Sequence, residues 1–153
     1  MQMIADSLGV TKAAVYHQFK TKDEIVLAAA EAELVKLEAA IEAAEREDSP
    51  TKAREVLVSQ MIDLAIENRR SMSPVLSDPV IVGFFAKHEP FRRTMGRLHR
   101  LLMGDDAGAD ARVPTALLVA AISGAVMHPL VVDLDDETLR AQLLLLARRF
   151  LNS

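Results

Sequence analysis

The sequence predicts an all-α protein. Alanine, leucine, glutamate and arginine are abundant, whereas only six of the 153 residues are glycine. No stretch alternates between apolar and polar residues with the period of two that marks a half-buried strand. Instead, apolar residues recur at helical spacing in one segment after another. Because 50% of the residues are hydrophobic, the chain can bury a sizeable core.

Two short helices are expected to open the chain. Residues 1–8 carry apolar side chains at helical spacing, and Gly9 ends that helix because glycine readily adopts the left-handed backbone that stops one. Thr11 is a candidate N-cap for a second short helix that reaches about Phe19. Two short helices joined at a glycine have the organisation of a helix-turn-helix.

Longer helices are expected to follow. Thr21 and Glu24 form an S/T-x-x-E capping box, and an apolar stripe extends this helix to about Arg46. Ser49-Pro50 predicts the start of the next helix, with serine as the N-cap and proline in the first turn.

Proline and glycine divide the second half of the chain. Residues 71–79 contain two prolines and predict a short helix or a turn, and Glu89-Pro90 starts a helix that reaches about residue 102. Residues 104–112 (GDDAGADAR) are the clearest loop.

Two strongly apolar helices are expected to close the chain. They cover about residues 113–127 and 136–151, with Asp135 or Asp136 as the cap of the second. Helices this apolar must be buried on more than one side.

Charge and composition restrict the function. The net charge of −4 argues against a general nucleic-acid binder. However, residues 9–22 contain lysines and no acid, whereas residues 31–48 contain seven acids. A chain with this charge distribution could contact a polyanion at its N-terminal end, although chance clustering on a solvated surface explains the charges equally well.

The absence of cysteine, of a secretory signal and of an unbroken apolar span predicts a cytoplasmic protein with no membrane partner.

The first segment meets the geometric demands of a helix-turn-helix. Ala5 leaves room for the second helix to cross, Gly9 allows the turn, and Val15 faces back into the first helix. By itself this spacing is moderately specific, since ordinary helical hairpins also satisfy it.

The run from residue 4 to residue 24 (IADSLGVTKAAVYHQFKTKDE) closely resembles the signature of the TetR family of bacterial transcriptional regulators, with Tyr16, Phe19 and Lys22 at the family's positions. The resemblance covers about residues 1–27. It implies a helix-turn-helix DNA-binding region at residues 1–24 and a helical ligand-binding and dimerisation domain at residues 25–153. The family's first helix has no counterpart before Met1, so we expect further residues upstream in the native protein.

The resemblance also assigns DNA contacts. The N-terminal end of a recognition helix lies against base edges in the major groove, where Lys12 can donate to guanine and Ala13 or Ala14 can contact a thymine methyl group. Tyr16 is expected to contact phosphate, and Lys22 lies where a helix N-terminus also attracts an anion. The full set of candidate DNA contacts is Thr11, Lys12, Ala13, Ala14, Tyr16, His17, Gln18 and Lys22.

The family further implies a homodimer through the last two helices, a double-stranded DNA operator with an inverted repeat, and release of the repressor by a small effector. We expect a largely apolar effector with one polar group met by a histidine or arginine. For each candidate ligand contact given below, the alternative is an ordinary packing role in the hydrophobic core. The candidate ligand contacts are Met61, Phe84, Phe85, His88, Met95, His99 and Met127.

Two other classes of protein are the alternatives. An enzyme would need a nucleophile with a base, paired carboxylates or a phosphate-cradling glycine loop, and the sequence contains none at usable spacing. We therefore expect no catalytic activity and no cofactor, and the scattered histidines do not predict a metal site. A helical dimerisation or adaptor protein whose helix-turn-helix no longer meets DNA remains open.

Overall fold

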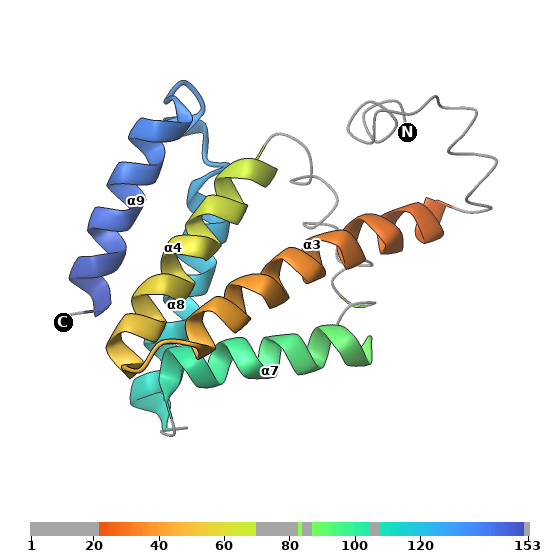
Figure 1. Cartoon of the computed structure of the whole chain (residues 1–153). Coiled ribbons are helices and arrows are strands. Elements are labelled where there is room, and N and C mark those ends of the chain that lie inside the picture. The colour runs from red at the N-terminus through yellow and green to blue at the C-terminus, as the bar shows by residue number, and fades with distance from the viewer. Residues whose placement is uncertain (1–21, 70–82, 84–86, 105–107, 152–153) are drawn as a thin grey trace.

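The computed structural model describes residues 22–69, 83, 87–104 and 108–151 (Figure 1). Within these residues the chain is helical and contains no strand, which confirms the expected all-α fold. The helices predicted at residues 1–8, 11–19 and 71–79 lie outside the described residues. The described elements are α3 (Lys22–Glu45), α4 (Pro50–Asn68), α7 (Glu89–Met103), α8 (Ala109–Ala125), the 3-10 turn η1 (Pro129–Val131) and α9 (Asp136–Leu151).

Helix α4 is the centre of the bundle. It packs against α3, α7, α8 and α9, which are all the other α-helices in the described part of the chain. Its buried face includes Leu57 and Ile62, both fully shielded from solvent. The core around it draws apolar side chains from every neighbouring helix, including Ile41 of α3, Leu98 of α7, Ile122 of α8 and Leu139 of α9.

Helix α3 leaves the bundle at its N-terminal end. Ala40, Ile41 and Ala44 in its second half are buried, as is Ala30 in its first half, and Figure 1 shows that first half extending away from α4. Helix α7 runs alongside α3 in the same view and packs against it.

Most predicted helix boundaries are confirmed. α4 begins at Pro50 after Ser49, although the serine side chain makes no capping hydrogen bond. α9 begins at Asp136, where the Asp135 carboxylate accepts a hydrogen bond from the Thr138 backbone N–H at 2.8 Å. That bond satisfies one of the free N–H groups that every helix N-terminus has.

Two boundary predictions are wrong. The loop expected over residues 104–112 is shorter, because α8 starts at Ala109 rather than at Val113. Alanines favour helix, and Asp110 in the first turn has a favourable interaction with the helix dipole, which together extend the helix into the loop. In α7, Glu89 is the first helical residue and His88 is the N-cap, so the helix starts one residue before the proline pattern predicts.

Candidate nucleic-acid interface and effector pocket

Seven of the eight predicted DNA contacts, those from Thr11 to Gln18, lie outside the described residues. The eighth, Lys22, is the first residue of α3. The predicted recognition helix is thus joined to the bundle by a helix of 24 residues that starts at Lys22. No described contact tests the base or phosphate roles of these residues.

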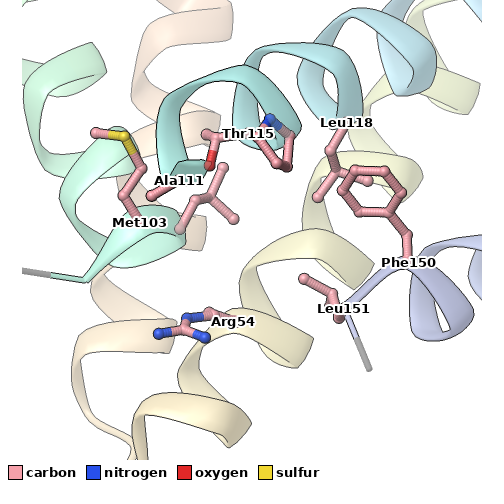
Figure 2. Close-up of a pocket in the computed structure, with 9 residues that line it drawn as sticks. Arg54, Met103, Ala111, Thr115, Leu118, Phe150 and Leu151 are labelled. Carbon is pink, nitrogen blue, oxygen red and sulfur yellow. The ribbon is translucent and has the colours of Figure 1, made fainter. Parts of the chain in front are cut away.

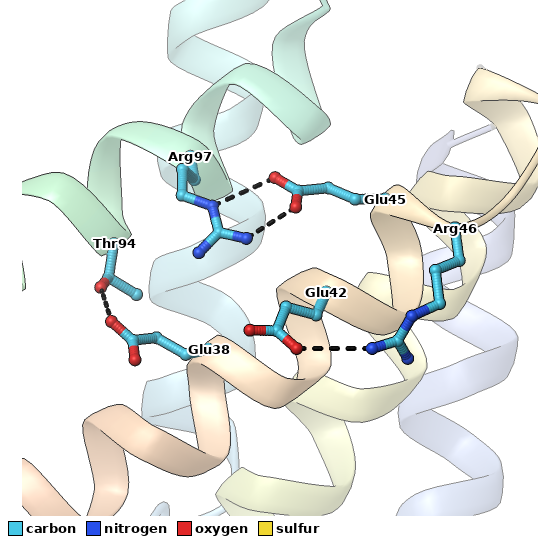
Figure 3. Close-up of polar contacts among 6 residues, drawn as sticks. All are labelled: Glu38, Glu42, Glu45, Arg46, Thr94 and Arg97. Carbon is cyan, nitrogen blue, oxygen red and sulfur yellow. Dashed lines mark hydrogen bonds and ion pairs between the residues drawn. The ribbon is translucent and has the colours of Figure 1, made fainter.

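Polar side chains make many of the contacts between α3 and α7. The Thr94 hydroxyl, which is 1% exposed, donates to a Glu38 carboxylate oxygen at 2.7 Å. Arg97 forms a two-pronged pair with Glu45, with Nε and Nη2 at 3.1 and 2.6 Å from the two carboxylate oxygens (Figure 3). The hydrogen bond from Arg97 holds the pKa of Glu45 below its ordinary value. This seam lets two helices meet without a continuous apolar contact.

A second polar contact joins α3 to the end of α4. The Lys36 ammonium lies 2.8 Å from Glu67 of α4 and 3.1 Å from Glu33 of its own helix, and the hydrogen bond to Glu67 is the main cause of its raised pKa. The Asn68 amide also donates to Glu33. Three of the acids concentrated in α3, Glu33, Glu38 and Glu45, therefore hold α3 to its neighbours.

The candidate ligand residues are dispersed. Met61 is buried in the apolar core and Met95 packs against that core. His88 caps α7, while His99 is exposed on the same helix. Met127 is 42% exposed after α8. Phe84 and Phe85 lie outside the described residues.

A pocket of about 200 Å³ lies among α4, α7, α8 and α9, and none of those candidates lines it. Its wall is mainly apolar and includes Leu118, Phe150 and Leu151 (Figure 2). Arg54 and Thr115 contribute the two polar side chains of the lining. The Arg54 Nε atom is buried and has no hydrogen-bond partner.

Sequence reasoning missed Arg54. The signal was present, because Arg54 lies one helical turn before Val58, a core residue that is 2% exposed. An arginine in register with the buried face of an amphipathic helix is unusual, since arginine is almost never buried unless it is paired. Reading every position of the stripe, rather than its apolar members only, would have found it.

Several large apolar side chains on α8, just after it and on α9 are exposed in the single chain. Val113, Leu117 and Met127 of the α8 stripe are 66%, 60% and 42% exposed, and Leu145 and Leu146 of α9 are 45% and 57% exposed. We call these five residues the outer face. Large apolar side chains gathered in one region of a surface are typical of an interaction site.

No helix in the described part of the chain is long and apolar enough to cross a membrane. The same residues contain no group of three histidine, aspartate or glutamate side chains that could hold a metal ion.

Comparison with known proteins supports the class that the fold and the N-terminal segment define. Residues 1–29 match a family model described as "Bacterial regulatory proteins, tetR family". An all-α bundle behind this segment is the organisation of a DNA-binding transcriptional regulator. The N-terminal segment of the chain is therefore similar to that of TetR-family regulators. The match ends within α3, and a comparison with curated proteins gives no match.

Proposed function

We propose that the protein is a cytoplasmic, ligand-responsive repressor that binds an inverted-repeat operator as a homodimer. The observation that supports this proposal is that residues 1–29 match the TetR family model and that α3 joins this segment directly to the helical bundle. We propose no catalytic activity. The regulator recognises base edges through Lys12 and its neighbours and contacts phosphates through Tyr16 and Lys22.

We propose the outer face as the dimer interface. Its five apolar side chains are exposed in the single chain, and a second copy related by a two-fold axis would remove them from water. Gly124 supports close approach of another helix, because a Cβ built there meets no atom within 4 Å. Pairing through α8 and α9 forms a four-helix interface of the kind that helix bundles use.

Helix α3 is the proposed connection between effector and DNA. It follows the DNA-binding motif directly, and its described polar contacts reach both α4 and α7. An effector lowers DNA affinity only if it binds more tightly to a state in which the two recognition helices are wrongly spaced. Polar seams, unlike a close-packed apolar core, allow such a tilt by exchanging hydrogen-bond partners.

A mobility-shift titration tests the proposal. The probe is the DNA upstream of the protein's own gene, with a shuffled sequence of equal composition as the control. We expect a complex on the upstream DNA that withstands an excess of the shuffled DNA. Equal binding to both probes, or none, would instead favour a helical adaptor protein that does not read DNA.

A further inference from the structure

The geometry points to a binding site for a small carboxylic acid with an apolar body in the pocket among α4, α7, α8 and α9, with Arg54 as the residue that recognises the carboxylate. The claim that this ligand is the effector rests on the regulator function proposed above. The claim that the pocket binds such an acid rests on the pocket alone.

Arg54 is the first argument. Among the residues that the structure describes, it makes no hydrogen bond or ion pair, whereas Arg97 and Arg140 each form a pair with two contacts to a carboxylate. Burial of the Arg54 Nε without a partner costs free energy that a bound anion would recover. The planar guanidinium matches the two oxygens of a carboxylate.

The lining of the pocket is the second argument. Figure 2 shows Arg54 at one end, Thr115 and Leu118 of α8 opposite it, and Phe150 and Leu151 of α9 along one side. A ligand with its charge at Arg54 would therefore place the remainder of its atoms against apolar side chains. Such a combination, one charged group in a mainly apolar wall, is the usual composition of a small-molecule site.

The surrounding charges restrict the ligand to a monoanion. Arg54 also borders a second pocket, whose lining includes the acids Glu45, Glu47 and Asp48 and the base Arg100. These acids disfavour a ligand with two or more negative charges, such as a phosphate ester, because like charges repel. The second pocket also has apolar residues in its lining, including Ala44, Pro50 and Leu101, but its acids disfavour an anionic ligand, so the ligand belongs in the first pocket.

The volume restricts the size. The pocket measures about 200 Å³. An apolar cavity of about 150 Å³ is large enough to bind benzene, so this pocket has room for a ligand of about that size or slightly larger. This suits a single-ring aromatic acid or a short to medium fatty acid and excludes ligands with several fused rings.

Calorimetric titration with sodium benzoate and sodium octanoate tests the inference, with benzamide and octan-1-ol as the neutral counterparts. We expect at least one acid to bind the wild-type protein and to raise its melting temperature. Its neutral counterpart should bind about ten- to a hundred-fold more weakly, because a hydrogen bond to a charged group is lost. Stabilisation by sodium sulfate equal to that by the acid would indicate general anion binding and would overturn the inference.

Three variants locate the site. Arg54→Gln should weaken acid binding about ten- to a hundred-fold, and Arg54→Lys should weaken it less because the charge remains. Ala111→Met should block binding by filling the pocket while leaving the arginine in place. Arg93→Gln is the matched control, because Arg93 is exposed on α7 and lines neither pocket. Circular dichroism verifies that each variant is folded.

Several results would overturn the inference. One is that the acids bind neither the wild-type protein nor the Arg93→Gln control. Another is that they bind Arg54→Gln as tightly as they bind the wild-type protein. A loss of stability in Arg54→Gln without ligand, together with no acid binding to wild type, would indicate that Arg54 pairs within the chain.

The binding measurement contains no DNA, so failure of the regulator proposal leaves it unaffected. The effector role is tested separately, by adding the acid to the complex with the upstream DNA, where we expect release of the DNA. Binding of the acid with no change in DNA affinity would overturn the effector role.

Discussion

The arginine side chains occupy very different environments. Arg140 pairs at the surface with Asp63 of α4 through two hydrogen bonds. The Arg69 side chain is only 6% exposed and lies 2.8 Å from the Asp136 carboxylate, which is 55% exposed. Arg69 also donates to the Leu134 carbonyl at 2.8 Å, while its other terminal nitrogen, Nη1, is buried without a hydrogen-bond partner. It therefore joins the end of α4 to the start of α9.

Removing the acid from this pair should cost more stability than removing the base. Asp136→Asn leaves the buried Arg69 guanidinium without its counter-charge and should lower the free energy of unfolding by about 1–3 kcal/mol. Arg69→Met removes the buried charge, fills a similar volume and should stay within about 1 kcal/mol of wild type. Urea denaturation of both variants measures the difference. The opposite order would show that the pair contributes through packing of the arginine rather than through its charge.

Two lysines of the DNA-binding segment should separate base recognition from phosphate contact. Lys12→Ala should lower operator affinity by about 1–3 kcal/mol and relax the base preference at one position in each half-site. Lys22→Ala should weaken binding to all sequences alike and reduce the slope of affinity against salt by about one unit. Fluorescence anisotropy across a salt series measures both effects. An unchanged slope for Lys22→Ala would remove its assignment to phosphate.

At the scale of elements, α3 has two different halves. Its second half is buried through Ala40, Ile41 and Ala44, and its polar side chains meet α7 and α4 along the seams described above. Apolar packing holds the second half in the core, while hydrogen bonds and ion pairs hold it against α4 and α7. A shift of α4 or α7 would therefore change contacts of α3, the helix that follows the DNA-binding segment in the chain.

The Arg97–Glu45 pair should contribute little to stability and do so only above acidic pH. The two side chains are 27% and 41% exposed, so Arg97→Ala should cost less than about 1 kcal/mol after solvent screening. Because the folded-state pKa of Glu45 is lowered from 4.5, the contribution is present above pH 4.5 and is lost as the pH falls through the folded-state pKa. Thermal melts of wild type and variant at neutral and acidic pH should therefore converge in acid. A difference that persists there would assign the effect to packing of the arginine stem.

At the scale of the whole molecule, most exposed large apolar side chains among the described residues lie on α8, on α9 and in the segment between them. α9 has two sides, with Leu139 and Ala147 buried against α4 and its neighbours and Leu145 and Leu146 in the outer face. Apolar residues on both sides agree with the composition from which the sequence predicts that α8 and α9 are buried on more than one side. A single chain leaves the outer face in water, and a second copy is the proposed cover.

Substitutions on the two sides of α9 should have different consequences. Leu146→Glu places a charge on the outer face and should yield a folded monomer, because the side chain is 57% exposed in the single chain. Leu143→Glu places the charge against the core and should unfold the protein or make it insoluble. Light scattering at micromolar concentration measures the mass, with Arg93→Glu on the exposed side of α7 as the control. A wild-type monomer under these conditions would overturn the dimer, and with it the expected spacing of about 34–36 Å between recognition helices.

The sequence by itself determined the helical class, most helix boundaries and the likeness of the N-terminal segment to one family. Helical periodicity, the proline after Ser49 and the cap at Asp135 are local signals, and local hydrogen bonding and sterics are sufficient to act on them. The family signature is likewise contained in one short run, residues 1–29.

Only the tertiary structure decided which side chains meet. Met61 and Met127 have the same chemistry in the sequence, yet one is in the core and the other is exposed. Arg54 faces Phe150 across a pocket, although nearly a hundred positions separate them along the chain. Helix packing brings such residues together through the crossing of α4 with α8 and α9, and periodicity along one helix contains no information about which neighbour covers each of its faces.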